Sequence, residues 1–318
     1  MKLSMDSTIL VIGSSNTDMV VKTNRFPMPG ETILGGDFLM NAGGKGANQA
    51  VAAARLGAKV KFICKTGADI FGREAVKSLE KEGIDTNHIL VDDANPSGVA
   101  LILVDDNAEN MIVVAPGANA NLTAVEMADL ADEIDKASYV LMQLEIPLKT
   151  VIHVAKYAKD KGVRTVLNPA PACKLPSDIY QHISIITPNE KEASMLTGVD
   201  VVDENTARTA ALKLYGKGVE TVIITMGAKG ALLLHDDEFT FVPASVVKAV
   251  DTTAAGDVFN GALVVALNEG KNYKEAVEFA CEASGISVTR DGAQASAPYR
   301  KELKGQLASW ALPIDFSK

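Results

Sequence analysis

The sequence is short of cysteine, of long apolar runs and of basic runs, and each shortage excludes a class of protein. Its three cysteines, Cys64, Cys173 and Cys281, are far apart without C-x-x-C spacing, so a disulfide framework or a zinc site is not expected. No apolar stretch approaches the roughly 18 residues that cross a bilayer, and the N-terminus has no signal-peptide pattern. With 31 basic and 40 acidic residues the net charge is −9, which argues against nucleic acids and anionic membranes as partners. These absences predict a cytoplasmic protein.

What the chain does have is the composition of a large folded domain. At 318 residues and 47% hydrophobic content it can form one α/β domain with a smaller appendage. From residue 59 onward apolar, strand-like runs alternate with helical segments, beginning with a strand at 60–64 and a helix at 70–82. That alternation predicts a mostly parallel central sheet flanked by helices on both faces, in a Rossmann-like arrangement.

Polar side chains recur just after the ends of the predicted strands. They are Asn16, Glu145, Asn168, Asn189 and Thr225. Because the carboxyl ends of parallel strands share one edge of a sheet, we expect these side chains to line one cleft. For Asn16 and its neighbour Asp18 the simpler interpretation is that they form a turn.

Two segments, residues 16–41 and 96–116, break the alternation because no helix follows their short strands. The first has strand-like runs at 19–21 and 32–34, and the second has the pattern of a hairpin around residues 105–107. We expect these segments to form a small sheet that stands off the main domain as a lid. Such a sheet has no helices to cover it, and its apolar residues outnumber what one small face can bury. We therefore predict a homodimer formed through the lid.

The stretch from residue 251 to residue 262 predicts an anion site. It follows a strand-like run at 246–250, passes through small residues and enters an apolar helical run. Backbone N–H groups of Ala254, Ala255 and Gly256 would be bare there, and the helix dipole adds partial positive charge. Asp257 lies inside this turn, where a carboxylate suits a base that takes a proton from a hydroxyl attacking a phosphate. The alternative is that Asp257 only occupies a first helical turn, where acids are favoured.

A glycine-rich stretch near the N-terminus predicts a second part of the site. Gly43, Gly44 and Gly46 allow close backbone approach before an alanine-rich helix at 47–56, which would carry Lys45 and Asn48 toward a polyhydroxylated ligand. It is neither a Walker A loop, since no Ser or Thr follows the lysine, nor a dinucleotide fingerprint, since the third glycine is missing. The alternative is a tight helix-packing turn whose lysine is in solvent.

Both stretches resemble the signatures of the ribokinase-like carbohydrate kinase family. The C-terminal signature of that family is roughly D-T-x-G/A-A-G-D, which residues 251–257 match, and residues 43–50 match the N-terminal signature. The resemblance covers residue 9 to about residue 298. It implies a single kinase domain over residues 1–318, with the lid inserted as about 16–41 and 96–116. It also implies ATP-dependent phosphorylation of D-ribose at O5, with Mg²⁺ carried on the nucleotide.

The resemblance implies roles for particular residues. Asp257 would be the catalytic base. The sugar would be bound by Asn16, Asp18, Gly44, Lys45, Asn48 and Glu145. ATP would be bound by Asn189, Thr225, Met226, Gly227, Ala228, Lys229, Gly230 and Gly256, with Glu192 acting on Mg²⁺ indirectly. A K⁺ site would be formed, in part through backbone carbonyls, by Asp251, Thr253, Ser287, Arg290, Gly292 and Ser296.

Two positions depart from the family pattern, and other functions stay open. Ala254 replaces a glycine seen in much of the family, and Cys281 stands where relatives have a polar residue near the adenine. Taken alone, residues 225–230 are typical of a hairpin connection and Asp251 of a turn cap. The alternatives are a kinase for fructose, a nucleoside such as adenosine or a deoxy-sugar acid, a silent sugar-binding relative, and a dinucleotide-binding oxidoreductase. The lid offers only Phe26 and Phe38 to stack on a base, which weakens the adenosine alternative.

Overall fold

The central element of the computed structural model, which describes residues 7–107 and 109–306, is an eight-stranded sheet with the order β14-β13-β12-β11-β10-β9-β1-β4. Its strands are β1 (Thr8–Ile12), β4 (Lys59–Ile63), β9 (Ala137–Met142), β10 (Arg164–Leu167), β11 (Ile185–Ile186), β12 (Thr221–Thr225), β13 (Gly230–His235) and β14 (Glu238–Pro243). Within this sheet the neighbouring strands β4, β1, β9, β10, β11 and β12 are parallel. β13 pairs antiparallel with β12, and β14 pairs antiparallel with β13. The predicted fold class, a mostly parallel sheet with a small second sheet, is confirmed.

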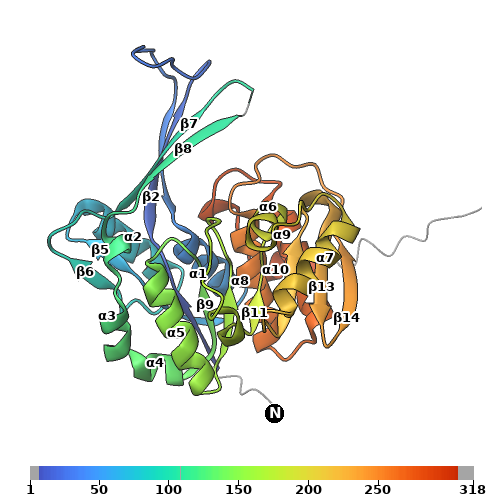
Figure 1. Cartoon of the computed structure of the whole chain (residues 1–318). Helices are drawn as coiled ribbons and strands as arrows, with labels where there is room; N and C mark the ends of the chain where they lie inside the picture. The colour runs from blue at the N-terminus through green and yellow to red at the C-terminus, as the bar shows by residue number, and fades with distance from the viewer. Residues whose placement is uncertain (1–6, 108, 307–318) are drawn as a thin grey trace, which may run out of the picture.

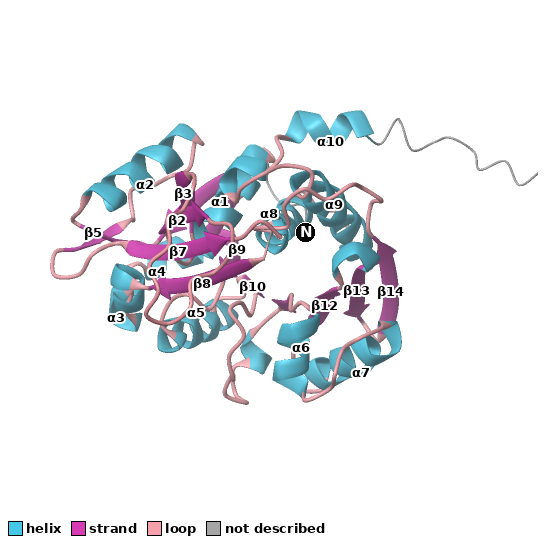
Figure 2. Cartoon of the chain, turned by 90° about the horizontal axis from the view of Figure 1, so that it is seen from above, coloured by secondary structure: helices cyan, strands magenta, loops and turns pink. Residues whose placement is uncertain are grey.

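Helices cover both faces of this sheet, as Figure 2 shows from above. They are α1 (Lys45–Arg55), α2 (Ile70–Lys81), α3 (Ala124–Asp129), α4 (Ala131–Asp135), α5 (Leu148–Asp160), α6 (Glu190–Thr197), α7 (Glu204–Tyr215), α8 (Ala255–Asn268), α9 (Tyr273–Ser287) and α10 (Arg300–Gln306). Side chains alternate along a strand, so Ile9 and Val11 pack with α1, α8 and α9, while Leu10 and Ile12 pack with α5 and α7. Every helix within the described ranges is too short or too polar to cross a membrane.

The small sheet has the order β3-β2-β7-β8 and projects from the body of the molecule (Figure 1). Its strands are β2 (Asn16–Lys22), β3 (Phe38–Gly43), β7 (Gly98–Val104) and β8 (Asn110–Ala115). We call it the lid sheet. A further parallel pair, β5 (Lys65–Gly67) with β6 (Leu90–Asp92), lies beside its base. Large apolar side chains of the lid sheet are exposed, including 54% of Leu101 and 68% of Val113.

Two of the expected strands are wrong. Residues 32–34 lie in the connection between β2 and β3, where the side chain of Leu34 is 97% exposed. Residues 246–250 form no strand either, and Val246 is 88% exposed. A tendency of apolar and β-branched residues toward strands is realised only where a sheet surface packs against them. Neither run has such a sheet surface packed against it.

Candidate active site

Glycines at the start of α1 bring that helix against the end of β1. Gly44 is the N-cap of α1 with φ 89°, and a Cβ there would lie 2.7 Å from the backbone nitrogen of Asn16. A Cβ on Gly46 would lie 2.6 Å from the backbone nitrogen of Ser14. Only glycine fits these positions, so the stretch 43–46 fixes where α1 begins. The side chains of the first turn of α1 are thereby placed at the carboxyl edge of the sheet.

Asp257, the predicted base, lies in the first turn of α8 and is 5% exposed. Two consecutive amides of α1 donate to its carboxylate: Asn48 Nδ2 to Oδ2 at 2.9 Å and Gln49 Nε2 to Oδ1 at 2.9 Å. The two helices approach closely because α8 has Gly261 at the contact, where a Cβ would lie 2.8 Å from the carbonyl oxygen of Gln49. The start of α1 and the start of α8 therefore form one site.

A network of buried amides continues behind the carboxylate. Gln49 Nε2 also donates to Oδ1 of Asn168 at 3.0 Å, and its Oε1 accepts from Nε2 of Gln143 at 2.6 Å. Both glutamines are fully buried. Sequence reasoning placed Asn168 in the cleft but gave no role to either glutamine. The available signal was amide side chains inside otherwise apolar runs, at the adjacent Asn48 and Gln49 in α1 and at Gln143 after β9.

Glu145 and Asp18 place two more carboxylates beside the start of α1. Glu145 Oε2 accepts from the backbone N–H of Lys45 at 3.0 Å and from the hydroxyl of Ser14 at 2.5 Å. Asp18, on β2, occupies the space that a side chain at residue 43 would need, since a Cβ on Gly43 would lie 2.2 Å from Asp18 Oδ2. Burial, reinforced by the charges of Glu145 and Asp257, raises the pKa of Asp18 to about 6.

Lys45 is the cation that balances these carboxylates. The charge of Asp257 raises the pKa of Lys45 more than burial lowers it, and Glu145, Glu192 and Asp18 act in the same direction as Asp257. Burial raises the pKa of Asp257, while Lys45 and the two amide donors oppose that rise. Lys45 is only partly exposed, so the interpretation of a lysine free in solvent is wrong.

Asn16 is held by a residue that sequence reasoning missed. Asn119, which is buried in the short helix Gly117–Asn121, donates from Nδ2 to Asn16 Oδ1 at 2.8 Å and accepts the backbone N–H of Ser15 at 2.9 Å. With its oxygen engaged, Asn16 is left to offer its NH₂ group to a ligand. A cavity of about 510 Å³ opens beside it, lined also by Glu145 and by the apolar side chains of Val114 and Ile146. One strand of the lid sheet thus faces the same space as the sugar residues predicted from sequence.

The predicted nucleotide residues lie at the neighbouring strand ends. Asn189 caps α6, and Glu192 completes the cap by accepting the backbone N–H of Asn189 at 2.9 Å and its Nδ2 at 3.0 Å. Asn189 also forms a β-bridge with Thr225, the last residue of β12. The hairpin that follows contains a short helix, Gly227–Lys229, and Lys229 Nζ donates to the carbonyl oxygen of Val202 at 2.8 Å. The hairpin expected for residues 225–230 is present, between β12 and β13.

Ala254, the N-cap of α8, adopts the left-handed region with φ 58°. A non-glycine residue there costs of order 1 kcal/mol or more, which is typical of functional sites. Gly256 is exposed, while the N–H of Ala255 already donates to the carbonyl oxygen of Thr252 at 3.3 Å. Of the three predicted anion-binding residues, Gly256 is therefore the most open.

Asp251 joins the two segments that were predicted to hold a monovalent cation. Its Oδ1 accepts the N–H of Thr253 at 2.8 Å, and its Oδ2 accepts the N–H of Gly292 at 2.9 Å. Arg290 instead pairs with Glu302 at 2.5 Å. The hydroxyls of the two predicted serines donate to carbonyl oxygens within their own turns. The side chains of Arg290 and of the two serines are thus engaged elsewhere, while Thr253 and Gly292 contact Asp251 through their backbone N–H groups.

The family model for pfkB family carbohydrate kinases matches residues 6–300. The chain belongs to this family. It is therefore a carbohydrate kinase, and the resemblance seen in its two signatures is confirmed.

This carbohydrate kinase is similar to proteins of closely related activities. A ribokinase of Haemophilus influenzae is 47% identical over 94% of this chain and 97% of its own length. A deoxyribokinase of Salmonella typhi is 39% identical over 91% of this chain and 95% of its own length. The structure of an Arabidopsis thaliana ribokinase complexed with ribose and ATP superposes with a TM-score of 0.90 at 32% identity, covering 95% of this chain and 98% of that one.

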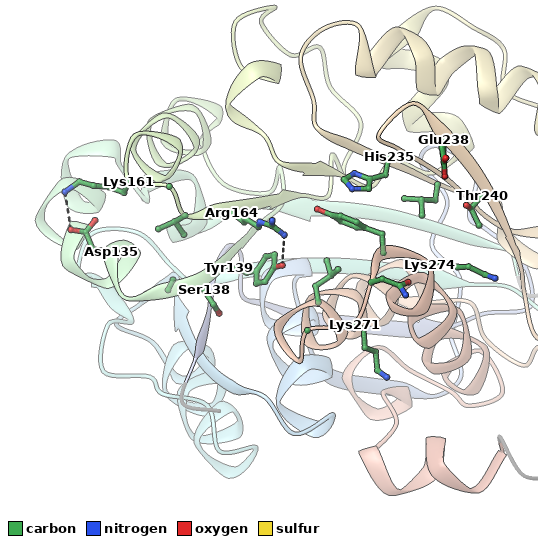
Figure 3. A pocket seen from close by; sticks show the side chains of 18 residues that line it. Asp135, Ser138, Tyr139, Lys161, Arg164, His235, Glu238, Thr240, Lys271 and Lys274 are labelled. Atoms are coloured by element: carbon green, nitrogen blue, oxygen red, sulfur yellow. Dashed lines mark hydrogen bonds and ion pairs between the residues drawn. The ribbon is translucent and has the colours of Figure 1, made fainter. Parts of the chain in front are cut away.

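The kinase has a larger cavity, of about 850 Å³, at the opposite edge of the main sheet (Figure 3). It is lined at the amino ends of β9 and β10, where Lys161 pairs with Asp135 at 3.3 Å and Arg164 bonds the hydroxyl of Tyr139 at 3.4 Å. None of the residues predicted for the site lines this cavity. Volume alone therefore does not identify the site, whereas the convergence of charged and amide side chains does.

Proposed function

We propose that this carbohydrate kinase transfers the γ-phosphoryl group of ATP to O5 of D-ribose. The observation that carries the proposal is the buried Asp257 carboxylate at the start of α8, held by amides of α1 next to Lys45, Glu145 and Asp18. Such a group of charged and amide side chains can bind a polyhydroxylated sugar and hold one hydroxyl at a base. The similarity to a ribokinase at 47% identity over nearly the whole chain supports ribose as the sugar.

In the proposed reaction Asp257 accepts the proton of the attacking hydroxyl. The sugar oxygen forms a bond to the γ-phosphorus, the bond from that phosphorus to the bridging oxygen breaks, and ADP leaves. The transition state of phosphoryl transfer is loose, so the hydroxyl needs little activation until late and a carboxylate suffices. The N-terminus of α8 would hold the phosphoryl oxygens, where backbone N–H groups stabilise the charge that accumulates.

Replacing the base tests this assignment. Asp257→Asn should lower kcat by about 10²–10⁴-fold, the usual contribution of a general base, while calorimetry still detects sugar binding. The assay couples ADP release to a dye and uses ribose, deoxyribose, fructose and adenosine as acceptors. A kcat near that of the unchanged protein would remove Asp257 from the reaction. A preference for deoxyribose would move the assignment to the second activity found among the relatives.

Magnesium would accompany the nucleotide, and Glu192 would act on it at a distance. Both oxygens of the Glu192 carboxylate accept from Asn189, but each retains acceptor capacity that suits a metal-bound water. Mg²⁺ keeps several of its waters in phosphate sites, so an indirect contact fits. When bound, the ion would neutralise charge on the phosphates.

Potassium would bind where Asp251 joins the segment at 251–253 to the loop at Gly292. One carboxylate supplies a single negative charge, which suits a monovalent ion, and the engaged side chains leave backbone carbonyls as the remaining ligands. Asp251 would then fix the turn that leads into α8. Exchanging K⁺ for a bulky organic cation at constant ionic strength should lower kcat, and Asp251→Ala should abolish that response. Equal activity of the unchanged protein in both salts would leave Asp251 as a turn cap only.

The lid sheet would cover the sugar and also pair two copies of the chain. Val114 lines the cavity next to Asn16, so its face of β8 looks toward the sugar. Val113 points to the other face, where it lies opposite Leu101 in the register of β7 and β8. That second face has large exposed apolar side chains, and a second copy would bury them. Because ATP is the donor, we place the reaction in the cytoplasm.

A further inference from the structure

We propose that Gln49 is a positioning residue that holds the Asp257 carboxylate ionised and correctly turned for proton transfer. The proposal rests on the function above, in which Asp257 is the base. The side chain of Gln49 is fully buried, and its amide donates to the Asp257 carboxylate.

The geometry gives Gln49 one available orientation. Its Oε1 accepts from Gln143 at 2.6 Å, and this contact turns Nε2 toward Asp257 Oδ1 at 2.9 Å and Asn168 Oδ1 at 3.0 Å. A primary amide nitrogen has two hydrogens, and both are used here. The opposite orientation would set the amide oxygen against the oxygens of Asp257 and Asn168. Gln143 and Asn168 therefore lock the amide in the orientation that donates.

The carboxylate is consequently fixed at both oxygens. Asn48 donates to Oδ2 and Gln49 to Oδ1, so rotation of the carboxylate would break one contact or both. Each oxygen still has a free acceptor site, through which it can take the proton of a sugar hydroxyl. Asn48 is 7% exposed, and among the described residues its Oδ1 is buried without a hydrogen-bond partner. A ligand hydroxyl can supply that partner, whereas both hydrogens of the Gln49 amide are already used within the protein, so Gln49 bears on the sugar only through Asp257.

The charges around Asp257 determine how much its pKa depends on the amide of Gln49. The titratable groups around Asp257 are Lys45 of α1, which favours its ionised form, and Asp18, Glu145 and Glu192, which disfavour it. Burial also raises the pKa of Asp257. A donor to the ionised form lowers that pKa. Removing the donor must therefore raise it, and the protein would need a higher pH before its base is ionised.

The test is the pH profile of kcat/KM for ribose in Gln49→Leu, which keeps the approximate volume and removes the amide. The acidic limb, which reports the ionisation of Asp257 together with that of Asp18, should move up by about one pH unit, in keeping with the loss of one hydrogen bond to a charged group; the same shift in an Asp18→Asn background assigns it to Asp257. The same limb should move further in Gln49→Glu, because a second carboxylate beside Asp257 raises the pKa of the pair. Gln49→Glu keeps the acceptor for Gln143, so it gives a reading if Gln49→Leu does not fold.

Thr165→Val is the matched control. Thr165 is fully buried at the far side of the sheet, where its hydroxyl donates to the carbonyl oxygen of His182 at 3.0 Å, so its loss destabilises the fold without touching Asp257. The acidic limb of the pH profile of Thr165→Val should stay in place. If the limbs of the Gln49 variants also stay in place while Asp257→Asn is inactive, the proposal for Gln49 is overturned and the proposed function stands. If Asp257→Asn remains active, Asp257 is not the base and the role of Gln49 fails with that assignment. If the unchanged protein does not phosphorylate ribose, the proposed function itself fails.

Discussion

At the scale of single residues, the site gathers negative charges whose mutual repulsion lowers the stability of the protein when no sugar is bound. Asp18, Glu145 and Asp257 surround one cation, Lys45. A bound sugar would satisfy these carboxylates with its hydroxyl groups, which is why binding sites retain charges that lower stability.

Asp18→Asn tests this cost through the pH dependence of stability. The pKa of Asp18 is about 6 in the folded protein, above the value of an unfolded aspartate, so the folded state binds the extra proton. Its contribution to stability is fully present below about pH 4 and is lost as the pH rises toward 6 and beyond. At pH 7 the free energy of unfolding of Asp18→Asn should therefore exceed that of the unchanged protein by about 1–3 kcal/mol. The variant should accordingly unfold at a higher temperature.

The measurement is thermal unfolding of both proteins, without sugar, at several values between pH 4 and pH 8. The difference between them should grow with pH up to about 7 and then become constant. A difference that is the same at pH 4 and pH 8 would contradict the raised pKa. The KM for ribose should rise in the variant, since a neutral amide replaces the ionised acceptor.

At the scale of secondary-structure elements, the contact between α1 and α8 places Asp257, the proposed base, against its amide donors. Gly261→Ala should disturb this contact, because the added methyl would lie 2.8 Å from both the carbonyl oxygen of Gln49 and Cβ of Ala52. Overpacking of a tight contact costs about 1–3 kcal/mol. We expect lower stability together with a lower kcat, since a shift of α8 carries Asp257 away from the amides of α1.

The control for this variant is Gly285→Ala in α9. The methyl added there meets only the side chain of Ser245, at 3.3 Å, and alanine favours the helix. Chemical denaturation gives the stability of each variant, and the coupled assay gives kcat. If Gly261→Ala loses stability but keeps kcat, the contact between the helices serves the fold and not the site.

Element types were largely predictable from sequence, and partner contacts were not. The run 9–12 predicts a buried strand because all its side chains are apolar, and β1 is buried on both faces. The runs at 32–34 and 246–250 have similar composition but no neighbour to pair with, and pairing is a property of the whole fold. The same limit applies in the site. The two signatures predicted Asp257 and Asn48, whereas Gln49, Gln143 and Asn119 act through contacts 94 to 208 positions away in the chain.

At the scale of the whole molecule, the exposed face of the lid sheet predicts a dimer. Val113→Lys would place a charge among the exposed apolar side chains that include Leu101 and Met111. An ammonium group buried without a partner is strongly unfavourable, so the variant should be a monomer at micromolar concentration. Light scattering measures the mass, which should be twice the chain mass for the unchanged protein.

Val125→Lys is the control, because Val125 is 73% exposed in α3, outside the lid sheet. It should leave the mass unchanged. An unchanged protein with the mass of one chain would contradict the dimer but not the role of the lid over the sugar.

The contact between Asn48 and Asp257 joins residues 209 positions apart, and this separation has a consequence during protein synthesis. A ribosome adds about 5–20 residues per second, so the donor waits roughly 10–40 s for its acceptor to be made. Throughout that interval a nascent chain already has the glycine-rich start of α1 but lacks Asp257, the proposed base. Chains that terminate before α8 should consequently be unable to transfer the phosphoryl group, and turnover is expected only after α8 has been translated.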